Sequence, residues 1–119
     1  MMFLQLGKET EVEVRLRTIG GSEHFKRQAV ADVLQIAQCF GLTALPLVTI
    51  GGTSRGNDGE MVSFRDTKTA TIYVRRRPKC ASFRFVLAHE LAHFWQLQND
   101  LPFDEQQADE MAFKVWGKV

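Results

Sequence analysis

The sequence is poor in several features that would assign it to a large class of proteins. Only two cysteines are present, Cys39 and Cys80, which are too few for a disulfide framework and are not arranged as C-x-x-C. The first residues contain no apolar run of signal-peptide length, and no segment reaches the length of a membrane span. The net charge of +1 lacks the strong basic excess that is typical of nucleic-acid-binding proteins. These absences favour a cytoplasmic protein with reduced cysteines and give no reason to expect a nucleic acid or a membrane as its partner.

The length and composition predict one globular domain that spans residues 1–119. A chain of 119 residues can bury roughly two thirds of its unfolded surface in one core. Its hydrophobic content of 45% and charged content of 24% are ordinary for a folded globular protein. The sequence shows no internal repeat and leaves the oligomeric state open.

The most informative stretch is residues 83–97, FRFVLAHELAHFWQL, in which His89, Glu90 and His93 form the pattern H-E-x-x-H. The stretch lacks Gly and Pro and is apolar at most positions, so it is expected to form a buried helix. Residues four apart share a helix face, so the two imidazoles can bind one metal ion. The alternative is a core helix whose two histidines are satisfied by other partners. The uncharged residues between and around the histidines favour a zinc site instead.

The remainder of the chain predicts an α+β fold. Alternating apolar and charged residues over 10–17 indicate a half-buried strand, and residues 23–40 have helical spacing between Ser22, a plausible N-cap, and Gly41, a plausible C-cap. Further strands are predicted at 45–50, 61–64 and 69–74, and further helices at 83–98 and 105–116. The expected architecture is an antiparallel or mixed sheet of three to four strands packed on the H-E-x-x-H helix and a C-terminal helix.

Two segments between these elements are open to more than one interpretation. Residues 51–60, GGTSRGNDGE, contain four glycines and no apolar side chain, and we interpret them as a solvated hairpin connection rather than an active-site lid. Residues 75–79, RRRPK, form a basic cluster. We interpret this cluster as a solvated strand-to-helix connection, with a site for phosphate or an acidic partner as the alternative.

A catalytic zinc ion usually has three protein ligands and one open position, so a third ligand is needed. The metzincin pattern would place it at residue 99 after a Gly at 96, but these residues are Asn99 and Gln96. The third imidazole of the chain, His24, belongs to a distant helix. The remaining source is a carboxylate of the last helix, which offers four candidates, Asp104, Glu105, Asp109 and Glu110.

HELAH at 89–93, followed by EQQADEMA at 105–112, resembles the gluzincin metallopeptidases, especially the small ImmA/IrrE-type enzymes and the minigluzincins, whose second motif is E-x-x-A-N/D-x-x-A. The resemblance implies a zincin-like fold, one Zn²⁺ ion and a protein or peptide substrate. It also implies that Glu105 is the third zinc ligand and that Asp109 supports a zinc-bound imidazole. Helix geometry agrees, since Glu105 shares the face of Ala108 and Ala112, whereas Glu110 falls on the polar face. Asp104 is expected to be the N-cap of this helix.

The resulting hypothesis is a zinc metalloendopeptidase in which Glu90 is the general base for the attacking water. Thr69–Val74 is the strand we expect to pair with an extended peptide as the edge of the sheet. Tyr73 is a candidate oxyanion stabiliser, although a packing role is favoured. Two alternatives stay open, a catalytically silent zinc-binding regulatory module and a structural zinc domain, but structural sites prefer four protein ligands and need no base.

Overall fold

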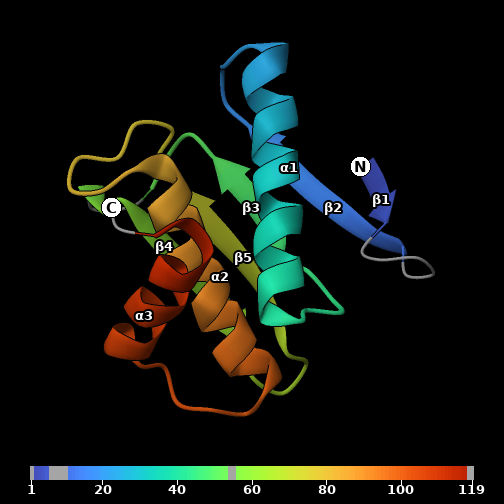
Figure 1. The fold of residues 1–119 in the computed structure, drawn as a ribbon, viewed down its shortest axis with the longest axis vertical. Coiled ribbons are helices and arrows are strands. Elements are labelled where there is room, and N and C mark those ends of the chain that lie inside the picture. Colours follow the sequence, from blue (N-terminus) through green and yellow to red (C-terminus); the bar gives the residue numbers. More distant parts are fainter. Residues whose placement is uncertain (1, 6–10, 54–55, 118–119) are drawn as a thin grey trace.

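The computed structural model describes residues 2–5, 11–53 and 56–117. It has five strands and three helices, and all three helices lie on one side of the sheet (Figure 1). The strands are β1 (Met2–Gln5), β2 (Glu11–Thr18), β3 (Leu47–Ile50), β4 (Gly59–Phe64) and β5 (Thr69–Val74). The helices are α1 (Glu23–Phe40), α2 (Phe83–Gln98) and α3 (Glu105–Trp116). The predicted α+β class is therefore confirmed.

The strands form a mixed sheet in the order β1-β2-β3-β5-β4. β2, β3 and β5 are parallel to one another, whereas β1 and β4 run antiparallel to their neighbours β2 and β5. The four strands predicted from the sequence are all present, and β1 adds a fifth that was not predicted.

The prediction that Thr69–Val74 is an edge strand is wrong. This strand, β5, pairs with β3 on one side and with β4 on the other, so both of its backbone edges are used. Ala70, Ile72 and Val74 are buried, as expected for an interior strand. The edge of the sheet nearest the helix α2 is instead β4.

The interpretation of residues 51–60 as a hairpin connection is also wrong. β3 and β4 are not neighbours, because β5 lies between them, so this connection passes the end of β5. Within it, Gly59 and Glu60 already belong to β4. The hairpin joins β4 to β5, and Lys68 in its turn has the positive φ of 53° that tight turns often require.

The ends of α1 follow the predicted capping signals. The Ser22 hydroxyl accepts a hydrogen bond from the Phe25 amide at 3.1 Å, and Gly41 has a left-handed backbone with φ 67°. The helix packs its buried residues against β2 and α2. Local capping therefore defines the helix, and its apolar face determines where it docks.

A partly buried ion pair connects the three helices. Asp32 of α1 is 2% exposed, and its carboxylate accepts hydrogen bonds from Arg84 of α2 at 2.9 Å and from Gln28 at 3.0 Å. The Arg84 guanidinium also lies 3.9 Å from the ring centre of Trp116 in α3. One charged side chain thus contacts all three helices.

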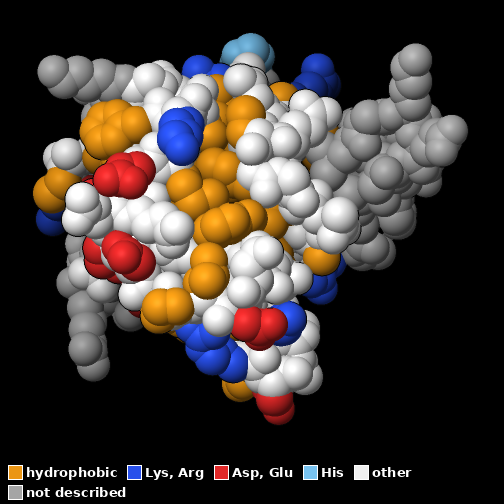
Figure 2. Space-filling view, turned by 60° about the horizontal axis from the view of Figure 1, so that its bottom comes forward, with side chains coloured by type: hydrophobic (Ala, Val, Ile, Leu, Met, Phe, Trp, Pro, Cys, Tyr) orange, Lys and Arg blue, Asp and Glu red, His pale blue; other side chains and the backbone are white. Residues whose placement is uncertain are grey.

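The surface of the described residues is not uniformly polar. Figure 2 turns the lower end of Figure 1 toward the viewer and shows hydrophobic side chains gathered in a band, with acidic and basic side chains beside it. Among the helices that the structure describes, none combines the length and the hydropathy that crossing a membrane would require.

Candidate metal centre

The helix α2 places both histidines and Glu90 on the side of the molecule that faces β4 and α3. Ser82 caps the helix by accepting a hydrogen bond from the Phe85 amide at 3.1 Å. His93 and Glu90 are buried, with exposed fractions of 6% and 7%, and the His89 side chain is 16% exposed. The two imidazole rings are 4.8 Å apart and nearly perpendicular. The i, i+4 spacing therefore brings both rings to one point, as predicted.

The third group of the cluster comes from the first residue of α3. Asp104 caps this helix through the Gln107 amide at 3.0 Å, which directs the next side chain, Glu105, toward α2. The Glu105 carboxylate oxygens lie 2.8 Å from Nε2 of His89 and 3.1 Å from Nε2 of His93. Of the four candidate carboxylates, Glu105 is thus the one that meets both imidazoles, as the resemblance implied.

The other two acidic candidates near the start of α3 have different positions. The Asp104 carboxylate is engaged in the helix cap, as expected. Glu110 is exposed, and its carboxylate accepts a 3.3 Å hydrogen bond from Gln106 on the outer surface of α3. His24 is exposed in the first turn of α1 and is not part of the cluster.

The donor set fits zinc. Ligand atoms from His89, His93 and Glu105 all lie within 4.8 Å of one another. Ligands bound 2.0–2.1 Å from one tetrahedral ion are separated by roughly 3.3 Å, and the separations of Glu105 from the two Nε2 atoms are slightly shorter. A small outward shift of this exposed carboxylate would admit the ion. Two imidazoles and one carboxylate also leave a fourth coordination position for water.

Each imidazole has a partner for its second ring nitrogen. His89 Nδ1 lies 2.7 Å from Asp109 Oδ1, and His93 Nδ1 lies 2.8 Å from Gln96 Oε1. Both partners offer oxygen acceptors at these distances, so they favour the tautomer with the proton on Nδ1, in which Nε2 carries the lone pair. This tautomer is the one that metal binding through Nε2 requires.

Gln96 is a functional candidate that the sequence reasoning missed. Its side chain is fully buried. Its Oε1 is the partner of His93, and its Nε2 donates to the Asp104 carbonyl at 3.0 Å and to Gln107 Oε1 at 2.9 Å. The available signal was a polar residue three positions after a ligand histidine in an otherwise apolar helix. The sequence analysis used Gln96 only to exclude the metzincin pattern.

Glu90 lies beside the cluster without belonging to it. Its Oε2 is 4.0 Å from His89 Nε2. Burial raises the pKa of the Glu90 carboxyl, and the nearby Glu105 and Glu60 carboxylates raise it further, whereas the two imidazoles lower it. Gly59 of β4 packs against this side chain so closely that a Cβ at residue 59 would lie 3.0 Å from Glu90 Cγ. A buried carboxyl group with a raised pKa is therefore held against the start of the edge strand.

A pocket of about 290 Å³ opens onto the cluster. Its walls come from β4, α2 and the start of α3: Gly59, Glu60, Met61, His89, Glu90, His93, Phe103 and Glu105. A second hollow of about 310 Å³ lies on the other side of His89 and Glu90 and includes Asp109. The cluster is thus accessible from the edge of the sheet.

Tyr73 is not among the residues that the structure brings to this pocket. It pairs with Glu60 across the sheet, whereas its neighbour Val74 pairs with Gly59, which faces α2. Successive side chains of a strand point to opposite faces, so the Tyr73 side chain lies on the face away from the helices. The oxyanion role considered for Tyr73 has no geometric support.

Comparison of the chain with protein-family models, with curated proteins and with solved structures gives no match. The function of the protein is therefore inferred from the geometry of the cluster and the pocket.

Proposed function

We propose that the protein is a zinc-dependent metallopeptidase of the gluzincin type. The observation that carries the proposal is the meeting of His89, His93 and Glu105 at one point, with the buried carboxylate of Glu90 beside it. Zinc supplies an activated water and a Lewis acid for the peptide carbonyl. The donor set and the separate carboxylate match this chemistry better than a structural site, which would use four protein ligands.

The residues around the cluster have separate roles in the proposed reaction. Glu90 accepts the proton of the attacking water and returns it to the leaving amine, and its raised pKa makes it a stronger base than an ordinary carboxylate. Asp109 and Gln96 hold the two imidazoles in the tautomer that leaves Nε2 free. The binding site therefore keeps the proton-transfer group separate from the ligands.

The substrate would bind along β4. Among the described residues, β4 pairs only with β5, so β4 is an edge strand, and such a strand can form backbone hydrogen bonds with an extended peptide. Gly59, Glu60 and Met61 of this strand line the pocket beside Glu90. Met61 and Phe103 give the wall an apolar part, which favours an apolar side chain next to the scissile bond.

Metal content and peptide cleavage together test the proposal. Purified wild-type protein should contain about one zinc ion per chain, and Glu105→Ala or His93→Ala should lose most of it by elemental analysis. Asp109→Asn should weaken zinc affinity or activity by roughly 10–100-fold. Glu110→Gln is the matched control, because this carboxylate lies on the outer face of α3 and should affect neither.

Digestion of a peptide library separates binding from chemistry. Glu90→Gln should keep zinc and lose at least about 100-fold in cleavage rate, the usual contribution of a general base. Retention of zinc by both ligand variants would exclude the metal site. If the wild-type protein binds zinc but cleaves no member of the library, the peptidase proposal is wrong and the protein is a catalytically silent zinc-binding module.

A further inference from the structure

Another pocket, of about 360 Å³, lies outside the metal centre, and three arginines of the basic cluster line it. It is formed at the carboxyl ends of the three parallel strands β2, β3 and β5, where the residues that follow each strand meet. In open sheets with parallel strands, this end is the usual place for ligands. The lining residues are Ile19, Gly51, Gly52, Thr53, Arg75, Arg76 and Arg77.

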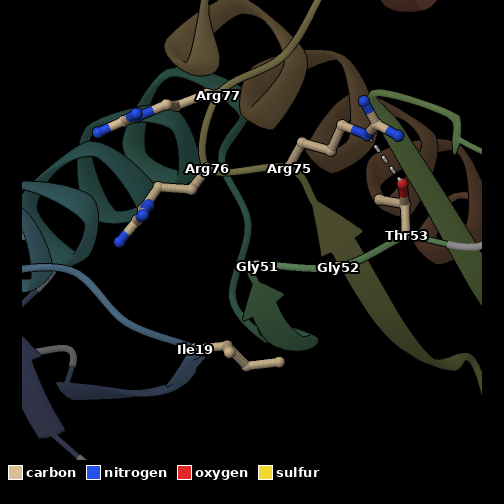
Figure 3. A pocket seen from close by; sticks show the side chains of 7 residues that line it. All are labelled: Ile19, Gly51, Gly52, Thr53, Arg75, Arg76 and Arg77. Atoms are coloured by element: carbon tan, nitrogen blue, oxygen red, sulfur yellow. Dashed lines mark hydrogen bonds between the residues drawn. The ribbon is translucent and has the colours of Figure 1, made fainter.

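Arginine side chains extend to two sides of the pocket, and the wall across from them is formed by two glycines. Figure 3 shows Arg75 and Arg76 extending to opposite sides of the hollow, with Arg77 on the same side as Arg76. Gly51 and Gly52 lie across from them, so a ligand can approach the backbone there. The pocket therefore presents positive charge at two separated places.

Arg76 has room for its guanidinium group because Gly20 and Gly21 have no side chains. Its Nη1 lies 3.0 Å from the place where a Cβ of Gly20 would be, and 3.6 Å from that of Gly21. Both glycines have a positive φ, 77° and 92°, at the turn before α1. This turn therefore leaves room for the guanidinium at the rim of the pocket.

The charges of the arginines are only partly compensated within the described residues. Arg75 Nε donates to Thr53 Oγ1 at 3.4 Å, and its charge contributes to the lowered pKa of Asp58. The main cause of that lowered pKa is different, because the Asp58 carboxylate accepts hydrogen bonds from the Lys79 and Cys80 amides, each at 2.8 Å. In the part of the chain that the structure describes, no acidic side chain forms an ion pair with Arg76.

We propose that this pocket binds a compact anion with two or more phosphate groups, of the pyrophosphate type. Guanidinium groups bind phosphate oxygens through paired, charge-assisted hydrogen bonds, and divergent arginines suit a ligand with anionic groups at both ends. Ile19 is the one apolar side chain among the lining residues, and none of them is aromatic, so the wall offers no aromatic ring on which a nucleobase could stack. The proposal is independent of the peptidase function, because it uses none of its residues.

The choice of Gly52 for a test follows from the local geometry. Its φ is not positive, and a Cβ at this position would meet no atom within 4 Å. Gly52→Asp therefore places a carboxylate opposite the arginines without a steric cost, and Gly52→Ala is the matched control for the added side chain. Arg76→Gln removes one cation from the pocket, and Lys114→Gln removes one from the exposed surface of α3.

Isothermal titration with sodium pyrophosphate at low salt tests the proposal. Two or more charge-assisted hydrogen bonds correspond to a dissociation constant on the order of 1 mM or tighter. Arg76→Gln and Gly52→Asp should each weaken binding by about tenfold or more, whereas Gly52→Ala and Lys114→Gln should bind as the wild type does. Glu105→Ala should also bind normally, which excludes chelation of zinc at the metal centre as the source of the heat.

Three results would overturn the proposal. The first is no heat and no thermal shift with pyrophosphate up to about 10 mM, well above the expected dissociation constant. The second is binding that Gly52→Asp and Arg76→Gln leave unchanged. The third is binding of a single-stranded oligonucleotide by a protein that does not bind pyrophosphate, which would assign the arginines to nucleic acid instead.

Discussion

The replacement of Gln96 by leucine would test how the metal centre is held together. Leucine is similar in size, but it offers no acceptor to His93 Nδ1 and no donor to the Asp104 carbonyl or to Gln107 Oε1. The site is fully buried, so water cannot easily replace the lost partners. The change therefore removes the orientation of one imidazole and a contact between α2 and α3 at the same time.

The expected magnitude follows from these contacts. A buried donor without an acceptor costs about 1–3 kcal/mol, and each further lost hydrogen bond costs about 1 kcal/mol. We expect the free energy of unfolding of Gln96→Leu to fall by about 3–5 kcal/mol. Zinc affinity should fall by about 10–100-fold, because the His93 ring is no longer held in the tautomer that presents Nε2 to the ion.

Competition for zinc with a chromophoric chelator, alongside denaturant unfolding, would measure both effects. Gln98→Leu is the matched control, since Gln98 is on the same helix and donates one hydrogen bond, to the Lys68 carbonyl at 2.8 Å, away from the cluster. It should lose stability but keep zinc affinity. Gln96→Glu keeps an acceptor for His93 and should retain most of the affinity. Equal zinc affinity in Gln96→Leu and wild type would refute the reasoning.

Three further changes have defined outcomes. Gly59→Ala should slow peptide hydrolysis by at least about tenfold with zinc retained, because its Cβ would lie 2.7 Å from Val86 Cγ1 and 3.0 Å from Glu90 Cγ; kinetics with metal analysis would check this. Glu90→Gln should raise the Tm of the metal-free protein at neutral pH. Burial raises the pKa of Glu90 in the folded protein, so ionisation of this group above its unfolded pKa of 4.5 opposes folding. Thermal scans should show that the gain in Tm vanishes as the pH falls below 4.5. Arg84→Ala leaves buried Asp32 without its cation and should lower the free energy of unfolding by about 1–3 kcal/mol, less than for a fully buried pair because the Arg84 side chain is 49% exposed; denaturant titration would show it.

The helices were predictable because their signals are local. Ser22 and Asp104 were expected to cap α1 and α3, and both side chains accept the backbone hydrogen bond that a cap requires. Pro102, just after α2, cannot continue a helix, and α2 ends before it. Each of these effects acts within a few residues, so one sequence contains all the information that is needed.

The order of the strands was not predictable in the same way. The residues of Thr69–Val74 favour a strand, but β-branched side chains do not specify which strands lie on either side. The connection 51–58 could lead to a neighbouring position or pass the end of a strand, and its glycines permit both. Placement of β4 at the edge is a consequence of the long-range pairing of β5 with β3 and of packing against α2, neither of which is encoded locally.

The residues of the proposed metal centre differ in the same way in how well the sequence predicts them. His89, Glu90 and His93 belong to one helix, so their relative positions follow from its periodicity. The approach of Glu105 depends on the turn between α2 and α3. The resemblance to gluzincins singled this residue out, and helix periodicity supported it by placing Glu105 on the face of Ala108 and Ala112. The partner of His93 was missed, since the role of a glutamine in an apolar helix cannot be read from the sequence. Its hydrogen-bond partners depend on how α3 packs on α2.

The contacts of Gln96 explain why Glu105, the proposed third ligand, and the second imidazole come into position together. The Asp104 amide donates to Gln96 Oε1 at 3.3 Å, and Gln96 Nε2 donates back to the Asp104 carbonyl. Asp104 is also the cap of α3, so this exchange fixes the point at which α3 begins and at which Glu105 leaves the backbone. The same glutamine oxygen accepts from His93 Nδ1. Because one buried side chain orients one ligand and anchors the residue before another, docking of α3 on α2 and preorganisation of the cluster are the same structural event.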